Sequence, residues 1–408
     1  MGIDFECPEY MLDRGELILL QSFVEKNRTA IRNKRLLIFG AGVRGSIFGL
    51  FLQNEGIKEF DYCDNNAKKW GGAIGSHSII SPEELQKRVN EYIVLISVES
   101  RDIIEFMEKQ LCEMGFEKEK NLFSLPSEIY NKYLNEFFRP IKDHVLIMGD
   151  CRFTFVSITD ENTQTLDDIL RKEFADREIP AKVLSMHALC MRAQYYMLKG
   201  QLELGNIPRI LILPINYETF NGTTHLLSSS QHTELMRRMY EQVGSKDREL
   251  EEYIQLTRQR TENPPFIFSV ENENGSAVIS DKKLRIFLKM SYMYQPDLES
   301  EGIVYLKKAL LLAKKYHIKV LTFAPPLNYM SGKEYWGEAF VVAYQKGLEV
   351  FKQIVLEYGG LFLDQSFLLT EDGFYSKYDK NELANYEGRI QMANSLLNFL
   401  KDSDENED

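Results

Sequence analysis

A cysteine, Cys151, stands directly after the apolar run VLIMGD and before the sequence RFT. A thiol at the carboxyl end of a strand and the start of a helix can act as a nucleophile, because helix N–H groups stabilise a thiolate and an oxyanion. The alternative is that Cys151 is a small buried hydrophobic residue. Its neighbour Arg152 could hold an anionic group of a ligand or pair with an acid, and both alternatives stay open.

The second chemical pattern is a glycine turn that follows the apolar run 36–39. Its spacing is G-x-G-x-x-G, with Gly40, Gly42 and Gly45. The first glycine permits a tight turn, the second a close approach to a pyrophosphate, and the third close packing of helix on strand. Asp64 ends the next apolar run, where an acid can accept hydrogen bonds from a ribose. We expect a nucleotide, a nucleotide-sugar or NAD here, and the alternative is a turn that binds no nucleotide.

Both stretches lie in an alternation of strand-like apolar runs and helical patterns. Such an alternation predicts parallel sheets, because each strand must cross over to the next through a helix. Residues 10–33 add a helical lead-in. The expected strands are 36–39, FDYC, 92–98 and 121–125 in the first half, and 144–148, 181–185, 209–214, 319–324 and 360–363 in the second.

The fold class that follows is α/β, with two doubly wound parallel-sheet domains. Two prolines bracket an amphipathic segment between them, which indicates a linker. A long polar stretch interrupts the second domain and is typical of a lid that shapes a substrate site. The expected organisation is a Rossmann-like nucleotide-binding domain at 1–126, a linker at 127–142, a second domain at 143–400 with a lid insertion at about 217–301, and an acidic disordered tail at 401–408.

Composition argues against several classes of partner. The 408-residue chain has a net charge of −12, which disfavours a nucleic-acid binder, because phosphate neutralisation needs clustered Lys and Arg. No apolar run has the ~18–20 residues of a membrane span, and the acidic start lacks the features of a signal peptide. Five cysteines without a CxxC pair favour reduced thiols in a cytoplasmic protein, with no disulfide framework and no metal site.

Two crevices in one chain would also suit a homodimer joined through the linker helix.

The segment DNNAKKWGGAIGSHSIISPEEL contains the pattern D-N…K-x-G…I-S-P-E-E-L. Together with the glycine turn, it resembles the small nucleotide-binding domains that precede bacterial sugar-modifying enzymes, over residues 33–125. The resemblance implies that this domain binds a nucleotide or nucleotide-sugar, or serves as a module beside a transferase. Trp70 could stack on a base or serve as a turn residue. A redox use of NAD is a weaker alternative, because no hydride-transfer site accompanies the turn.

The stretch GDCRFT resembles the first motif of the SGNH/GDSL hydrolases, G-D-S-x-T, with Cys151 in the serine position. Asn216, in PINY, matches the asparagine of the family's G-x-N-D motif, whose glycine and aspartate are absent here. Asp379 matches the aspartate of the last motif, D-x-x-H, and Glu382 stands in place of its histidine. The resemblance implies a three-layer, flavodoxin-type α/β/α domain. It further implies a nucleophile at Cys151, an oxyanion donor at Asn216, and orienting or activating groups at Asp379 and Glu382.

No histidine follows His317, so the family's base is replaced. A carboxylate can act as a base toward a thiol when burial raises its pKa, and His187, His225 or His232 is an alternative base. The two resemblances together imply an SGNH-like esterase or O-acyltransferase that acts on a carbohydrate, in cell-surface polysaccharide biosynthesis of a bacterium. The alternative is a noncatalytic nucleotide-sugar-binding or regulatory protein that has lost the catalytic histidine.

Overall fold

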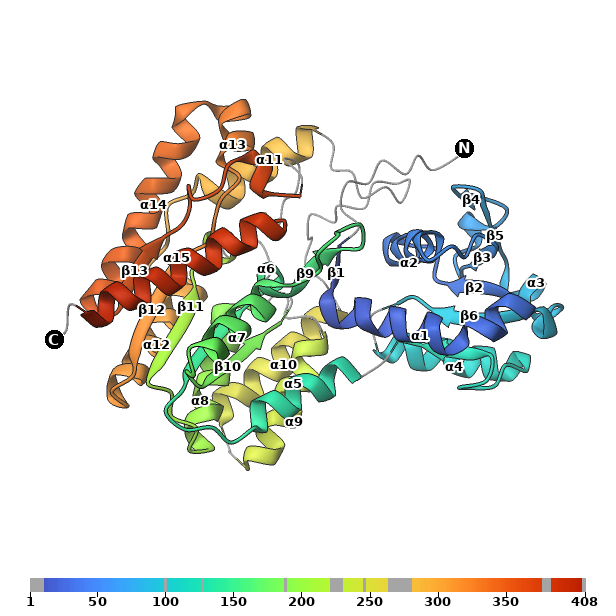
Figure 1. Cartoon of the computed structure of the whole chain (residues 1–408), viewed down its shortest axis with the longest axis horizontal. Helices are drawn as coiled ribbons and strands as arrows, with labels where there is room; N and C mark the ends of the chain where they lie inside the picture. The colour runs from blue at the N-terminus through green and yellow to red at the C-terminus, as the bar shows by residue number, and fades with distance from the viewer. Residues whose placement is uncertain are drawn as a thin grey trace. The chain divides into compact units, whose positions relative to one another are not determined.

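The computed structural model describes residues 11–98, 101–125, 128–186, 189–220, 230–244, 247–262, 281–375 and 383–405. These residues divide into two compact units, with the boundary between Ile129 and Tyr130. Figure 1 shows the elements of each unit along the chain. The chain is therefore α/β, as the alternation of patterns predicts.

The first unit contains a six-stranded sheet in the order β4-β5-β3-β2-β6-β7. All neighbouring strands run parallel except β4 and β5, which are antiparallel. The expectation of a wholly parallel sheet is wrong for this unit, because the short β4–β5 pair adds an antiparallel edge. Its elements are β1 (Met11–Asp13), α1 (Arg14–Asn33), β2 (Arg35–Phe39), α2 (Val43–Asn54), β3 (Phe60–Cys63), β4 (Ala73–Ile74), β5 (His77–Ile80), α3 (Pro82–Gln86), β6 (Tyr92–Ile96), α4 (Arg101–Met114) and β7 (Leu122–Ser124), with short 3-10 turns η1 (Ala67–Lys69) and η2 (Val89–Glu91).

Both faces of this sheet are buried. Leu37 and Phe39 of β2 pack with Met107 and Leu111 of α4 on one face. On the other face, a side chain at Gly49 of α2 would collide with the Tyr62 ring of β3, so the glycine allows this helix to lie close to the sheet. Parallel strands covered on both faces must be apolar throughout, which explains runs such as RLLIF and YIVLI.

The second unit has a five-stranded sheet, in the order β10-β8-β11-β12-β13, and all four pairings are parallel. Its elements are α5 (Glu128–Phe138), β8 (Val145–Gly149), α6 (Cys151–Thr154), β9 (Phe155–Ser157), α7 (Leu166–Asp176), β10 (Ala181–Ser185), α8 (Met191–Glu203), β11 (Ile210–Pro214), η3 (Tyr217–Phe220), α9 (Ser230–Val243), α10 (Arg248–Glu262), α11 (Asp281–Tyr292), α12 (Glu301–Lys315), β12 (Lys319–Ala324), α13 (Tyr329–Trp336), α14 (Glu338–Glu357), β13 (Leu361–Asp364), η4 (Glu371–Gly373) and α15 (Tyr386–Glu405).

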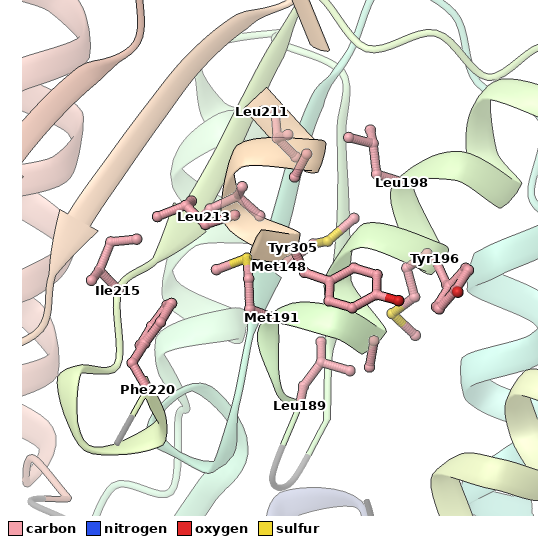
Figure 2. Close-up of a cluster of buried hydrophobic side chains, with 14 of the residues drawn as sticks. Met148, Leu189, Met191, Tyr196, Leu198, Leu211, Leu213, Ile215, Phe220 and Tyr305 are labelled. Carbon is pink, nitrogen blue, oxygen red and sulfur yellow. The ribbon is translucent and has the colours of Figure 1, made fainter. Parts of the chain in front are cut away.

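Alternate residues of each strand feed two separate cores, which makes this unit three-layered. Val145 and Ile147 of β8 point to the core shared with α7 and α15. Leu146 and Met148 point to the opposite core, shared with α8, α12 and α14. Figure 2 shows part of this second core, with Met148, Leu211 and Leu213 of the sheet near Leu198 of α8 and Tyr305 of α12.

Two segments differ from the expected organisation. Most of the expected linker is the helix α5, whose Phe137 is fully buried in the second unit's core. The insertion contributes the amphipathic helices α9 and α10, whose apolar residues such as Met236 and Tyr253 extend the same core. The acidic tail is helical through Glu405, as the end of α15.

Candidate functional site

Cys151 and Asn216 lie beyond the carboxyl ends of two neighbouring strands. Cys151 follows β8 and Asn216 follows β11, and the register pairs Ile147 with Ile212, so that the two strands end level. The strand β8 has β10 on one side and β11 on the other, so the chain changes direction across the sheet at this point. Open α/β sheets bind their ligands outside the carboxyl ends of the strands at such a switch point.

Asp150 organises the turn between β8 and α6. Its carboxylate accepts hydrogen bonds from the backbone N–H of Arg152 at 3.0 Å and from Arg152 Nη1 at 3.1 Å. The same carboxylate accepts a hydrogen bond from Nδ2 of Asn216. Glycine is needed just before it, because a Cβ on Gly149 would lie 2.3 Å from the ring of Phe153. The G-D sequence is thus explained by packing and by capping of the turn.

Two residues that the sequence analysis does not single out complete this arrangement. Glu218 Oε1 accepts from Arg152 Nη2 at 3.3 Å, and Glu218 Oε2 accepts from the hydroxyl of Tyr292 at 2.8 Å. We call Asp150, Arg152, Asn216, Glu218 and Tyr292 the Asp150 network. All five are buried, with exposed fractions between 2% and 6%. An acid close after Asn216 in the apolar context PINYETF is the only sequence signal for Glu218.

Of the two alternatives for Arg152, pairing with acids is the one that the geometry displays, since its guanidinium bridges Asp150 and Glu218. A contact with a ligand stays a prediction. Oδ1 of Asn216 and Oγ1 of Thr154, a residue of α6, are buried and have no hydrogen-bond partner among the described residues. Buried acceptors of this kind normally receive a donor, such as water or a ligand hydroxyl.

The bases that the sequence analysis offers for Cys151 lie outside the residues that the structure describes. Asp379 and Glu382 fall outside the described residues, as do His187, His225 and the side chain of His232. Two described histidines of the second unit, His144 and His317, precede β8 and β12 and therefore lie at the amino ends of the strands, opposite Cys151. The sequence assignment of Asp379 and Glu382 consequently stays a prediction.

Cys151 itself is half-buried. It is the first residue of α6, directly between Asp150 and Arg152, so the hydrogen bond that the Arg152 N–H donates to the Asp150 carboxylate spans it. Cys190 is half-buried as well; it precedes α8, and its Sγ lies 3.6 Å from the hydroxyl of Tyr253. Burial raises the pKa of the Cys190 thiol, and a protonated thiol is a weak nucleophile.

The glycine turn of the first unit has the geometry that its spacing predicts. Gly40 has a φ of +117°, a conformation that favours glycine, and its N–H donates to the carbonyl of Cys63 at 2.8 Å. A Cβ on Gly45 would lie 1.9 Å from the carbonyl oxygen of Gly40, whereas one on Gly42 would meet nothing within 4 Å. Gly42, the N-cap of α2, thus leaves open space at the point where a ligand could approach the backbone.

Asp64 contacts the glycine turn directly. Its Oδ2 accepts from the backbone N–H of Ala41 at 2.8 Å and from Lys69 Nζ at 2.9 Å, and its Oδ1 accepts from the N–H of Asn66 at 2.8 Å. Trp70 donates its indole N–H to the carbonyl of Asp64 at 2.6 Å while 38% of the residue is exposed. The structure therefore brings together the expected nucleotide-binding residues, and a ribose contact by Asp64 stays a prediction.

A charged residue within the turn was missed by the sequence analysis. Arg44 pairs with Glu16 of α1, and its guanidinium lies 5.4 Å from the ring centroid of Phe48. Burial lowers the pKa of Arg44 to about 10, so the residue stays protonated at neutral pH. Its charge is balanced by Glu16, so the helix dipole at the amino end of α2 is the feature that favours an anion here.

Among the described residues, no group of three or more His, Cys, Asp and Glu side chains could hold a metal ion. The same part of the chain contains no helix that is long and apolar enough to span a bilayer.

Comparisons with known proteins find only distant similarity. No family model matches the chain, and no curated protein matches it either. Among solved structures, Axe2, an acetylxylan esterase from Geobacillus stearothermophilus, is similar over 63% of this chain and 93% of its own, with 13% identity and a TM-score of 0.32. A catalytic mutant of Axe2 gives 12% identity and a TM-score of 0.30. Similarity at this level assigns no role to any residue of this chain.

Proposed function

We propose that the second unit is a cysteine-dependent esterase or O-acyltransferase. The observation that carries the proposal is the placement of Cys151 and Asn216 beyond adjacent strand ends at the switch point, joined through Asp150. This is where an α/β fold presents a nucleophile and a hydrogen-bond donor to the same ligand.

The proposed chemistry proceeds in two steps. The thiolate of Cys151 attacks the ester carbonyl, the alkoxide leaves with a proton, and a thioester forms on the sulfur. Water or an acceptor hydroxyl then attacks the thioester, which regenerates the thiolate and releases the acid or the new ester. Asn216 Nδ2 carries a second N–H besides the one donated to Asp150 and would stabilise the oxyanion in both steps. Asp379 or Glu382 would accept and return the proton.

The carbohydrate substrate and the nucleotide are proposals that rest on the sequence resemblances. An acylated sugar would supply hydroxyl donors to the buried acceptor oxygens of Asn216 and Thr154. In the first unit, the open space at Gly42 and the positive end of α2 would suit the phosphates of a nucleotide or nucleotide-sugar. Both features fit a role in cell-surface polysaccharide biosynthesis.

Intact-protein mass spectrometry tests the proposal. The wild type, incubated with p-nitrophenyl acetate or acetyl-CoA, is expected to show a transient acetyl adduct that Cys151→Ala lacks. Cys151→Ser is the matched variant, because it keeps a nucleophilic atom and the size of the side chain, and it is expected to hydrolyse the ester slowly. Native spectra recorded beforehand would reveal a co-purified nucleotide, including NAD.

A second candidate function is noncatalytic binding or regulation. It is favoured by the closed pairing of Asn216 with Asp150 and of Arg152 with Glu218, and by the position of His144 and His317 at the amino ends of the strands. A folded wild type that forms no adduct and hydrolyses no ester, yet carries a nucleotide-sized ligand, would favour this second function over the first.

A further inference from the structure

Tyr292 ends α11, late in the insertion, and its hydroxyl enters the Asp150 network through Glu218, at the start of the insertion. It donates to Glu218, Glu218 accepts from Arg152, and Arg152 donates to Asp150. Asp150 in turn holds the N–H of Arg152 and the amide of Asn216. One continuous series of hydrogen bonds therefore runs from the end of α11 to the residues on both sides of Cys151.

The guanidinium of Arg152 is the rigid link in this series of hydrogen bonds, so a displacement at one end moves the groups at the other end. Its planar fork has a fixed geometry, with Nη1 on Asp150 and Nη2 on Glu218. Hydrogen bonds to charged groups are strong in a buried site, and each bond polarises the next. We therefore expect a shift of Glu218 to rotate the fork and move Asp150, whose carboxylate holds the amide of Asn216 and the backbone N–H that follows Cys151.

A second tyrosine provides an internal comparison. Tyr294 donates its hydroxyl to the carbonyl of Tyr217 at 2.6 Å, and Tyr217 donates its own to the carbonyl of Tyr294 at 2.8 Å. Tyr292 and Tyr294 thus each connect the segment after α11's start to η3 through a phenol hydroxyl. The hydroxyl of Tyr292 donates to the carboxylate of Glu218, whereas that of Tyr294 donates to a backbone carbonyl.

We propose that Glu218 and Tyr292 are positioning residues for Cys151 and Asn216. They hold Arg152, and through it Asp150, in the arrangement that presents the thiol and the amide to a substrate. The inference rests on the proposed function and deepens it, because it assigns the residues that hold the same site in position. Neither residue needs to touch the substrate.

The test compares Tyr292→Phe with Tyr294→Phe, which remove the same atom two positions apart. With p-nitrophenyl acetate we expect Tyr292→Phe to lower kcat by about tenfold with KM unchanged to within about twofold. Tyr294→Phe is expected to change both constants by less than about twofold. Glu218→Gln, which keeps the size of the side chain and its acceptor oxygen, is expected to resemble Tyr292→Phe. The double variant should be no worse than the poorer single variant, because the two residues act through one path.

Alkylation of Cys151 by iodoacetamide, followed on its peptide by mass spectrometry at one fixed pH, supplies a readout that needs no turnover. We expect Tyr292→Phe and Glu218→Gln to change its rate by about threefold or more, and Tyr294→Phe to leave it unchanged. Equal effects of Tyr292→Phe and Tyr294→Phe, or no effect of either, would overturn the inference. If the wild type hydrolyses nothing while the alkylation rates still separate, the proposed function fails and the positioning role stands.

Discussion

At the residue scale, Asp150 determines more of the site's geometry than its neighbour Cys151. It caps the turn through the N–H of Arg152, pairs with the guanidinium of the same residue and holds the amide of Asn216. A buried carboxylate needs such partners, because an unpaired charge in the interior is very costly. The aspartate of the G-D-C sequence is therefore explained by the buried groups that surround it.

His144 is a second buried polar residue, at the opposite end of β8. It is fully buried, and neither of its ring nitrogens has a hydrogen-bond partner among the described residues. Burial, and then the positive charges of Lys182 and Arg139, lower the pKa of His144 to about 4. The folded protein therefore holds this imidazole neutral at pH values where the unfolded chain protonates it.

We predict an acid-dependent loss of stability that originates at His144. Because the folded pKa lies below the unfolded value of about 6.5, the unfolded state binds more protons between the two pKa values, and the free energy of unfolding falls as pH falls through this range. Between about pH 7 and pH 5 the loss amounts to about 2 kcal/mol. Urea unfolding of the wild type and of His144→Leu at the two pH values measures it. An equal loss in both proteins would show that other groups are responsible.

At the element scale, both candidate sites use a turn from a parallel strand into a helix, and both turns depend on one glycine that has no room for a Cβ. In the second unit this is Gly149, against the ring of Phe153, and in the first it is Gly45, against the carbonyl of Gly40. The strands supply rigid ends, and the glycines allow the next residues to lie close to them. This is why short sequence patterns locate both turns.

The glycine turn offers a matched pair of substitutions. Gly45→Ser is expected to lower the free energy of unfolding of the first unit by about 1–3 kcal/mol, because the new Cβ would collide with backbone that cannot move away cheaply. Gly42→Ser introduces the same side chain where nothing lies within 4 Å and at an N-cap position that suits serine. It should therefore change stability by less than about 0.5 kcal/mol. Thermal unfolding measures both, and a similar loss for the two variants would contradict this account of the turn.

At the scale of the whole molecule, each unit has its own core and its own candidate site. Every described residue of the Asp150 network belongs to the second unit, and the glycine turn with Asp64 belongs to the first. Leu111 of α4 and Leu396 of α15 are both fully buried, one in each unit.

We therefore predict that core substitutions act unit by unit. Leu111→Ala should cost about 2–5 kcal/mol, seen as faster amide exchange in β2 and β6, with unchanged exchange in β8 and β11. Leu396→Ala should show the reverse pattern. Hydrogen exchange followed by mass spectrometry resolves the two units. Equal acceleration of exchange in both units by either variant would show that they unfold together.

The sequence by itself determined the α/β class, the positions of the parallel strands other than β5, and the two turns that follow β2 and β8. These features depend on local apolar periodicity and on glycine spacing, which neighbouring residues encode. The lead-in helix α1 was likewise expected from its pattern. The antiparallel β4–β5 edge and the burial of the linker helix in the second unit's core were not, because both depend on what covers a short segment rather than on the segment itself.

Only the tertiary structure decided which groups meet at the Cys151 turn. Glu218 and Tyr292 are 66 and 74 positions away from their partners Arg152 and Glu218 in the sequence, and no local pattern joins residues so far apart. Strand order decided that β8 and β11 are neighbours, which placed Asn216 beside Asp150. Buried charges are paired by the fold because an unpaired charge is so costly in the interior. Asp150 lies in the same motif as Arg152, whereas its second partner, Glu218, is a property of the packed chain.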